Sequence, residues 1–545
     1  MKRHSVVLIV LLLTVSLVTS LPGNLMAPAQ AQAPGGEGHF AIASGSIDHL
    51  DPALWYFALT WRLGYALCTP LVTFPDAAGE PGKQVVGGLA DLPVVSADGL
   101  TYTFTLKPGL KFADGRPITG EDIKATFERL FNPTLASPAT GFFTNIVGTQ
   151  DFAAGKAKDI SGITVADNKV TFQLTTPTAS FLKRMTMPFT CPVPKGTPPT
   201  AMEDGELLLT GPFKVESYEP NRQLVLVRNP NYNEEAMGRH PQLDKITIDI
   251  GVDPAQAALM LRSGQLDLFL ENLAAADAAQ ALNDATLKDR VQKSARAEIL
   301  YMFLNNDVPP LDNVKVRQAI NYAINRNALL RVWGGPSQGS VTDQVLPPTM
   351  SGWKDADIYP MGGNVEKAKQ LLAESGVKLP VDVTLYTSSD QAGYKEVAQA
   401  VQAQLKEVGI NVKIEAVINS VLGSMIMTRA SKVPMGLVMW SQDYPDPDDF
   451  IDVLLDGTRI TETNNQDFAA FNSPEISKEI ASLAGVSGPE RDARYMALDE
   501  KIIRDYAPWA PILNPVRVEM IGDRVTNFIV HPVYGPDIAV VGVKK

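Results

Sequence analysis

Apolar and polar residues alternate over several short segments in the first half of the chain. In residues 101–106 the side chains of Tyr102, Phe104 and Leu106 share one face, and three threonines share the other. This period of two predicts a half-buried strand. Further strands are predicted at residues 170–174, 224–228 and 245–250. We therefore expect the first half of the chain to be rich in strands.

The spacing of apolar residues becomes helical after residue 119. Thr119 and Asp122 have the spacing of a helix-capping pair, and Ile123, Phe127 and Leu130 form an apolar stripe that stops before a proline. This pattern predicts one short helix inside the strand-rich half.

The second half of the chain has mainly helical periods. Residues 314–330 predict one long helix, and residues 365–374 predict another between Asn364 as its N-cap and Gly376. A strand, a helix and a second strand are predicted next, at residues 381–386, 393–408 and 410–417. Such short links between them favour a right-handed parallel crossover. The whole pattern predicts a mixed α/β protein.

An acidic segment with two prolines follows the apolar run at residues 435–439, which predicts a buried strand. Residues 440–450 have the sequence WSQDYPDPDDF. Pro445 and Pro447 exclude a helix or a central strand around them. A rigid loop is therefore expected after the strand.

Asp443 is the strongest candidate for a binding residue in this loop. It lies next to the predicted strand end, between Trp440 and Tyr444. Ligands bind at the carboxyl ends of strands in α/β folds, and a carboxylate beside aromatic rings suits a small cationic group. Acidic side chains are usually exposed, so the later acids are expected to be solvated. These later acids are Asp446, Asp448 and Asp449.

The N-terminal residues have the pattern of a secretory signal peptide. Lys2 and Arg3 precede an apolar stretch, and the segment ends in an A-x-A cleavage site at residues 31–33. An uncleaved membrane anchor is the alternative, but residues 6–21 fall short of the ~20 residues that a spanning helix needs. The segment contains no cysteine that could carry a lipid. We therefore expect cleavage after residue 33 and a periplasmic protein without a lipid anchor.

The length, net charge and cysteine content of the chain limit its domain number and the classes of partner that it can bind. The chain has 545 residues and a net charge of −12, and it contains no run of lysine or arginine. Two or three domains are expected at this length, and the acidity argues against nucleic acid or an anionic membrane surface as a partner. Cys68 and Cys191 are the two cysteines. They could form one disulfide in an oxidising compartment or remain as two buried thiols.

Motifs for catalysis and metal binding are weak. Residues 335–339 match the G-x-S-x-G pattern, but they lack the preceding strand and following helix that a nucleophile elbow needs. A calcium loop starting at Asp443 would need glycine and glutamate where Asp448 and Leu454 stand. No nucleotide-binding G-x-x-x-x-G-K-[ST] motif occurs. The residues therefore predict no cofactor and no metal.

Several motifs occur in an order and spacing that identify a family. They are residues 50–52 (LDP), 69–72 (TPLV), 88–90 (GLA), 111–115 (KFADG), 210–214 (TGPFK), 228–232 (RNPNY) and 305–326 (NNDVPPLDNVKVRQAINYAINR). With these motifs the chain resembles the extracytoplasmic solute-binding proteins of the peptide/nickel type, the large binding components of ABC importers. The resemblance runs from about residue 39 to residue 538.

The resemblance implies an α/β, two-lobed periplasmic binding protein fold with mixed sheets, a hinge of two segments and an extra subdomain in the first lobe. The first lobe would comprise residues 34–297 and 515–545, with the inserted subdomain at about residues 79–206. The second lobe would comprise residues 298–514. Both cysteines fall in the first lobe, which makes a disulfide geometrically conceivable.

The resemblance also implies a binding site. In peptide-binding members an aspartate at the position of Asp443 pairs with the N-terminal ammonium of the peptide. Residues 55–58 resemble the strip of the first lobe that faces the ligand backbone. The expected ligand-binding residues are Asp443, Trp440, Tyr444, Trp55, Tyr56, Phe57 and Ala58. The few histidines outside the signal region make the chain poor in the ligands that nickel or haem would need.

The implied function is capture of short peptides in the periplasm and their delivery to an inner-membrane ABC permease. We expect a monomer with no nucleic-acid partner. A non-peptide solute, such as an opine, a sugar or glutathione, is the alternative within the same carrier role. A secreted hydrolase is the alternative from a different class.

Overall fold

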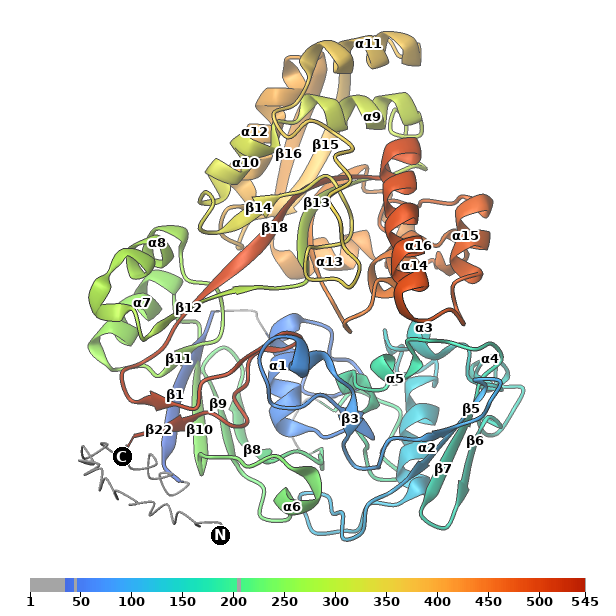
Figure 1. Cartoon of the computed structure of the whole chain (residues 1–545), viewed down its shortest axis with the longest axis vertical. Coiled ribbons are helices and arrows are strands. Elements are labelled where there is room, and N and C mark those ends of the chain that lie inside the picture. The colour runs from blue at the N-terminus through green and yellow to red at the C-terminus, as the bar shows by residue number, and fades with distance from the viewer. Residues whose placement is uncertain (1–34, 44–46, 203–206, 545) are drawn as a thin grey trace, which may run out of the picture. The chain divides into compact units, whose positions relative to one another are not determined.

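The computed structural model describes residues 35–43, 47–202 and 207–544. The expected signal peptide at residues 1–33 lies outside these described residues. Residues 34–545 form one unit by their internal contacts. Three sheets of four or more strands organise this unit (Figure 1).

A five-stranded sheet is built from the start of the described chain and from residues 213–269. Its order is β11-β1-β10-β9-β8. β1 is parallel to β10 and β11, whereas β9 is antiparallel to β10 and β8. The bounds are Glu37–Ile42 (β1), Phe213–Glu219 (β8), Gln223–Arg228 (β9), Lys245–Ile250 (β10) and Leu268–Phe269 (β11). The sheet is mixed, and the strands predicted at residues 224–228 and 245–250 are confirmed.

A four-stranded antiparallel sheet, in the order β4-β5-β7-β6, packs against helix α2. The bounds are Val94–Val95 (β4), Thr101–Thr105 (β5), Ile163–Ala166 (β6), Lys169–Gln173 (β7) and Gly120–Leu130 (α2). The Asp122 carboxylate accepts hydrogen bonds from the backbone N–H (2.8 Å) and the hydroxyl (2.7 Å) of Thr119. The predicted strands and the capped helix in this region are confirmed.

A seven-stranded mixed sheet contains most strands of the second half. Its order is β12-β18-β13-β17-β15-β16, with β14 paired to β18. The bounds are Val291–Ala295 (β12), Glu298–Leu304 (β13), Gly339–Val341 (β14), Val381–Ser388 (β15), Ile410–Val417 (β16), Met435–Ser441 (β17) and Trp509–Met520 (β18). Helix α12 (Tyr394–Lys406) lies between β15 and β16 in the chain and packs on both. Since β15 and β16 are parallel, the predicted crossover is confirmed.

The long helix predicted at residues 314–330 is wrong, because the chain forms two helices there. α9 spans Val314–Ala323 and α10 spans Arg326–Trp333. Ile324 is extended, and the Asn325 side chain accepts a hydrogen bond from the Ala328 N–H, which starts a new helix. Helix α11 (Val365–Ser375) begins after Asn364 and ends at a left-handed glycine, as predicted.

The acidic loop is shorter than predicted. β17 continues to Ser441, and helix α14 (Asp448–Leu455) begins directly after Pro447. The first backbone N–H groups of a helix have no partner within the helix, so a proline just before the first turn costs no hydrogen bond. The helix can therefore begin directly after Pro447. Asp448 and Asp449 therefore lie in the first turn of a helix.

Two antiparallel strands connect the two larger sheets. β12 pairs with β18 from Val291–Met520 to Ala295–Val516, and Ile521, just after β18, bridges to Leu268 in the five-stranded sheet. Of the two hinge positions that we expect, residue 515 lies within β18, and residue 297 lies in the link between β12 and β13 (Figure 1). The exact lobe boundaries and the subdomain at about residues 79–206 stay predictions.

The remaining elements are short strands and helices around the sheets. The helices are Ala58–Leu67 (α1), Thr140–Phe143 (α3), Thr149–Ala153 (α4), Phe181–Arg184 (α5), Glu234–Met237 (α6), Pro254–Ser263 (α7), Ala275–Asn283 (α8), Asn419–Ile426 (α13), Pro474–Ala481 (α15) and Gly488–Lys501 (α16). The strands are Val72–Thr73 (β2), Val86–Gly87 (β3), Val525–Thr526 (β19), Val530–His531 (β20), Gly535–Pro536 (β21) and Gly542–Val543 (β22).

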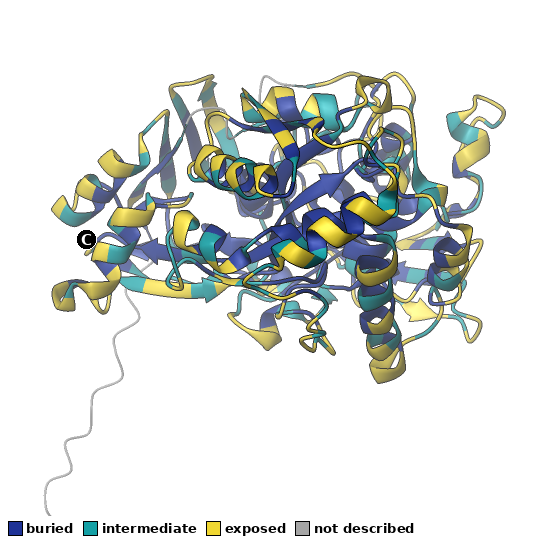
Figure 2. Cartoon of the chain, turned by 90° about the horizontal axis from the view of Figure 1, so that it is seen from above, coloured by how far each residue is buried: buried dark blue, intermediate teal, exposed yellow. Residues whose placement is uncertain are grey.

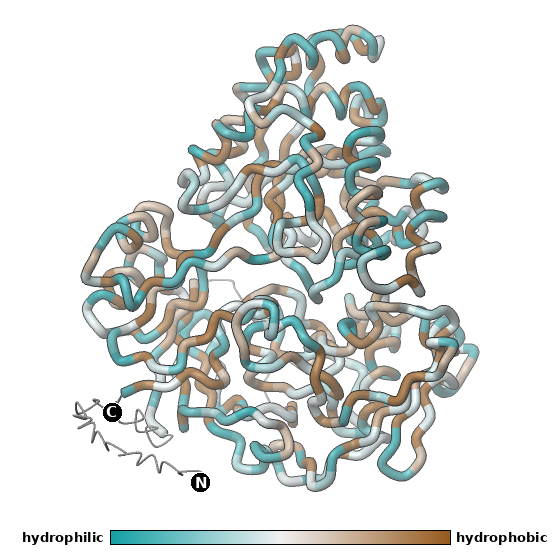
Figure 3. The backbone as a smooth tube through the Cα atoms, viewed as in Figure 1, coloured by the Kyte–Doolittle hydropathy of each residue, from teal (hydrophilic) through white to brown (hydrophobic). Residues whose placement is uncertain are grey.

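Strands form most of the buried interior, and the helices turn one face outward (Figure 2). Hydropathy follows the same division, since brown hydrophobic segments concentrate along the strands of the sheets (Figure 3). Within the part of the chain that the structure describes, no helix has the length and apolar character needed to cross a membrane.

Candidate functional site

Asp443 lies just beyond β17, the strand that places Trp440 opposite Ile299 of β13. Only 7% of the residue is exposed. Among the described residues, no donor forms a hydrogen bond with its buried Oδ2 atom. Burial raises the pKa of Asp443 well above its usual value. A buried carboxylate without a cationic partner is costly for the protein.

Asp446 and Asp448 are buried too, but they have cationic partners. Lys183 Nζ lies 2.9 Å from Asp446 Oδ2, and an Arg184 nitrogen lies 2.9 Å from Asp448 Oδ2. Arg491 of α16 pairs with Asp446 and lies 3.3 Å from Asp448. Burial would raise the pKa of Asp448, but Arg184 and Arg491 lower it below its usual value. The expectation that these acids are solvated is wrong, because α5 and α16 bring cations to them.

Asp449 is fully buried and is joined to Asp443 by a backbone hydrogen bond. The Asp443 N–H donates to Asp449 Oδ2 at 2.8 Å. Within the described chain, the buried Oδ1 atom of Asp449 has no hydrogen-bond partner. Burial, and then the nearby Asp443, raise the pKa of Asp449 well above its usual value. The solvated position expected for Asp449 is therefore also wrong, because its side chain is buried and accepts the Asp443 N–H.

Tyr56 reaches this acidic pair from a segment far away in the sequence. Its ring meets the Trp440 ring edge-on, with 6.4 Å between the ring centres, and stacks on the Phe189 ring, with 5.9 Å between the ring centres. The backbone N–H of Tyr56 donates to Asp48 Oδ2 at 2.6 Å, which fixes the segment. Burial raises the pKa of the Tyr56 hydroxyl, and Asp443 adds to this shift. Tyr56 therefore contacts Trp440 close to Asp443, and the role of these three residues in ligand binding stays a prediction.

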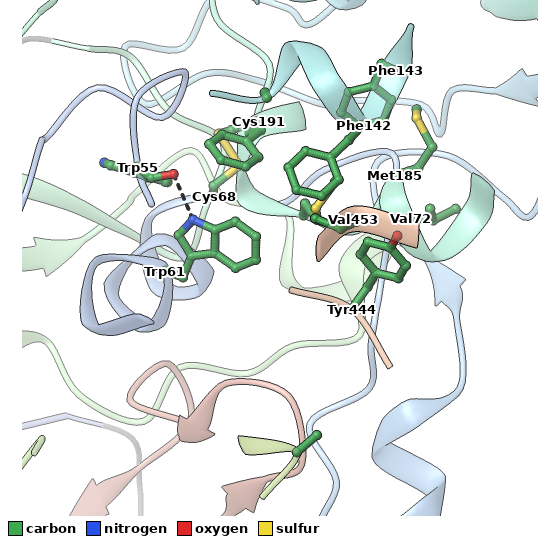
Figure 4. Close-up of a cluster of buried hydrophobic side chains, with 14 of the residues drawn as sticks. Trp55, Trp61, Cys68, Val72, Phe142, Phe143, Met185, Cys191, Tyr444 and Val453 are labelled. Carbon is green, nitrogen blue, oxygen red and sulfur yellow. Dashed lines mark hydrogen bonds between the residues drawn. A yellow bond between two sulfur atoms is a disulfide. The ribbon is translucent and has the colours of Figure 1, made fainter. Parts of the chain in front are cut away.

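The other three residues of the predicted strip have different positions. Trp55 is fully buried, and its carbonyl accepts a hydrogen bond from Trp61 Nε1 at 2.9 Å (Figure 4). Phe57 is partly buried and precedes α1 as its N-cap, and Ala58 is exposed at the first turn of that helix. Tyr56, by contrast, contacts Trp440 of β17.

The Tyr444 ring packs near Arg184, the partner of Asp448. The centres of the Tyr444 and Phe142 rings lie 6.4 Å apart, and the Arg184 guanidinium lies 5.7 Å from the centre of the Tyr444 ring. Figure 4 shows Tyr444 beside Phe142 and Val453. Tyr444 therefore helps to hold Arg184 in place, a role that its neighbouring position in the sequence does not reveal.

A disulfide joins Cys68 and Cys191 (Figure 4). Cys68 directly follows α1, and Cys191 follows the short helical turn that carries Phe189. The bond therefore ties the segment after Tyr56 to the segment that stacks on Tyr56. It holds two walls of the aromatic cluster together.

Sequence reasoning missed four contributors to the site, namely Lys183, Arg184, Phe189 and Arg491. The first three lie more than 200 residues before Asp443 in the chain, and no local pattern marks any of the four as a partner. Groups of three or more histidine, cysteine or acidic side chains suited to a metal ion do not occur among the described residues. The arrangement at Asp443 suits an organic cation, because it combines a carboxylate with aromatic rings.

Comparisons with known proteins find bacterial solute-binding proteins, the class that the sequence motifs resemble. The model for bacterial extracellular solute-binding proteins, family 5 (middle region), matches residues 84–462. Heme-binding protein A of Haemophilus influenzae is 29% identical over 469 residues, which cover 82% of this chain and 81% of that protein. A Brucella abortus protein, named provisionally as an ABC transporter peptide-binding protein, is 29% identical over 531 residues, 94% of this chain and 93% of its own.

A solved structure shows the fold. The periplasmic binding protein DppA of Helicobacter pylori, in complex with the peptide STSA, superposes with a TM-score of 0.81 at 24% identity. The match covers 94% of this chain and 99% of that chain. The expected α/β, two-lobed periplasmic binding protein fold is confirmed. Since the family model also matches more than half of its length, the chain belongs to the bacterial extracellular solute-binding proteins of family 5.

Proposed function

We propose that this protein is the periplasmic binding component of an ABC importer and that it captures short peptides by their N-terminal ammonium. The observation that carries the proposal is the buried Asp443 carboxylate, whose Oδ2 has no partner in the described chain. The Brucella relative is named for peptide binding, and the Helicobacter structure contains a peptide. Both support a peptide as the ligand.

The ammonium would donate charge-assisted hydrogen bonds to Asp443, while Trp440 and Tyr56 cover its apolar side. Trp440 comes from the proposed second lobe (residues 298–514), and Tyr56 comes from the proposed first lobe (residues 34–297 and 515–545). A ligand that contacts both lobes binds the closed state more tightly than the open one. Closure would then be the signal that the inner-membrane permease recognises.

The remaining features of the proposal concern location and partners. The signal peptide at residues 1–33 would be removed, and no lipid would be attached. The carrier would act as a monomer because its two lobes must move, and it would have no nucleic-acid partner and no cofactor.

A hydrolase is less well supported than a carrier. Ser337 of the G-x-S-x-G segment lies between α10 and β14, and its hydroxyl donates to the Gly334 carbonyl at 3.5 Å. A serine nucleophile also needs a histidine later in the chain, and the histidine that follows Ser337 is His531, whose Nδ1 accepts the Val533 N–H at 3.1 Å. Both candidate groups are engaged in local turns, and the family consists of solute-binding proteins.

Mass spectrometry of ligand released from the purified mature protein tests the proposal. We expect short peptides to be recovered from the wild-type protein and much less ligand from the Asp443→Asn variant. Recovery of a sugar, an opine or haem would replace the peptide by another solute in the same carrier role. Equal retention by the variant, or turnover of a recovered peptide, would contradict the proposal.

A further inference from the structure

Asp443 and Asp449 together present two carboxylates to one small region. The 2.8 Å hydrogen bond from the Asp443 N–H to Asp449 Oδ2 keeps the residues side by side. Each has one buried side-chain oxygen without a hydrogen-bond partner in the described part of the chain. A single ammonium would suffice for Asp443 alone, so Asp449 needs a separate explanation.

The charged and titratable groups around the pair do not neutralise it. Both carboxylates help to raise the pKa of Tyr56, from the segment before α1, and Asp443 helps to raise the pKa of Tyr65 of α1. Asp449 has two further titratable neighbours, the negatively charged Asp448 and the neutral Tyr444. Arg184 of α5 lowers the pKa of Asp449, but it is engaged by two other acids, at 2.9 Å from Asp448 and 3.2 Å from Asp452.

Polar atoms that border the pair also lack partners. The Tyr56 hydroxyl and Trp440 Nε1 are buried, and neither has a hydrogen-bond partner among the described residues. Trp440 is 7% exposed, and its ring meets the ring of Tyr56. Buried polar atoms are normally satisfied by protein, water or ligand. The Tyr56 hydroxyl and Trp440 Nε1 can therefore donate hydrogen bonds to a polar ligand bound beside the acidic pair.

We propose that Asp449 is a second ligand-contacting carboxylate and that the pair selects a ligand end with two positive charges. The inference rests on the proposed function, because it assumes that Asp443 receives a cationic ligand end. Suitable ends carry an α-ammonium with a second amine nearby, as in peptides that begin with a diamino acid.

Charge balance explains the preference. Two adjacent buried carboxylates repel each other when both are ionised. A ligand with one positive charge leaves one carboxylate to be neutralised by a proton, whereas a ligand with two positive charges neutralises both. Affinity for the singly charged ligand should therefore fall as pH rises and the retained proton is lost. Affinity for the doubly charged ligand should rise over the same range.

Two small amines test the inference without assuming a peptide. The dissociation constants of 1,3-diaminopropane and n-propylamine are measured at neutral pH by ligand-observed NMR titration. We expect the wild-type protein to prefer the diamine by about tenfold or more. The preference should fall to about twofold in Asp449→Asn, in which the amide oxygen can still accept the Asp443 N–H. Asp449→Glu keeps the charge and should retain the preference.

The control variant is Glu366→Gln, which removes an exposed negative charge elsewhere, on a side chain that is 87% exposed. It should leave the preference unchanged. The inference is overturned if neither amine binds, if the wild-type protein shows no preference, or if Asp449→Asn keeps it. If the diamine binds as expected and peptides do not, the proposed function fails while the two-charge site stands.

Discussion

Two pairs of buried acids lie within seven residues of each other, and they differ in their neighbours. Asp446 and Asp448 contact Lys183, Arg184 and Arg491. Asp443 and Asp449 form no ion pair with a cationic side chain within the described residues, whereas an oxygen without a hydrogen-bond partner occurs on Asp448 as well as on both of them. The comparison shows that burial alone does not assign a role to an acid. The presence or absence of a protein cation separates acids that are paired within the protein from the acids that we propose for the ligand.

The difference comes from the elements that pack on each side of the loop. Helices α5 and α16 bring three cationic side chains to Asp446 and Asp448. The segment before α1 instead brings the Tyr56 ring and hydroxyl toward Asp443. The paired acids therefore fix the loop, and the fixed loop holds the unpaired acids in position.

The largest effect on folding is expected for Asp448→Asn. This change removes the carboxylate that Arg184 and Arg491 share, and breaking a buried ion pair costs about 3–5 kcal/mol. Urea denaturation measures the free energy of unfolding. Asp443→Asn is the matched control and should cause no such loss. Equal losses in the two variants would remove the distinction between paired and unpaired acids.

Asp449→Asn should stabilise the protein in a pH-dependent way. Because burial raises the pKa of Asp449 in the folded state, ionisation costs stability as pH rises above the unfolded value. The variant avoids this cost, which is about 1.4 kcal/mol for each unit by which the pKa is raised. Unfolding curves from pH 4 to pH 8 should show a gain that grows with pH. A gain that is constant or shrinks with rising pH would mean that Asp449 has a hidden partner.

Lys183→Met should have a smaller effect than Asp448→Asn. The Lys183 side chain is 33% exposed, and Asp446 keeps Arg491 as a partner after the change. We expect a loss of about 1 kcal/mol in the free energy of unfolding. Lys195→Met is the matched control, because its pair with Glu121 is exposed on both sides. If both variants were equally stable, Lys183 would not contribute to fixing the loop.

The smallest effect is expected for Tyr56→Phe. The hydroxyl is buried without a described partner, so its removal should change the free energy of unfolding by less than about 1 kcal/mol. Ring contacts with Trp440 and Phe189 remain in the variant. A large loss of stability, measured by thermal unfolding, would show that the hydroxyl has a structural partner.

Local patterns predicted the fold well where one element decides its own structure. The period of two at residues 101–106 and the capping pair at Thr119 correspond to β5 and α2. The continuous helix at residues 314–330 failed because a single asparagine, Asn325, starts a new helix within an unbroken apolar pattern. Such a break depends on one side-chain hydrogen bond, and the spacing of apolar residues carries no information about it.

The site was predictable only in part, for a related reason. Asp443 could be proposed as a binding residue because it follows a buried strand, and Trp440 lies on that strand. Burial of Asp446 and Asp448 depends on Lys183 and Arg184, which are distant in sequence and close in space. The sequence shows the acids, but the fold decides which of them remain without a cation.

Calorimetric titration of the recovered ligand into the wild-type protein and Asp443→Asn tests the central claim most directly. Hydrogen bonds from an ammonium to a desolvated carboxylate contribute roughly 1.5–3 kcal/mol. The account therefore predicts that the variant binds about ten- to a hundredfold more weakly, while its unfolding free energy does not fall. Unchanged affinity in the variant would contradict the account, because the ligand cation would then bind elsewhere.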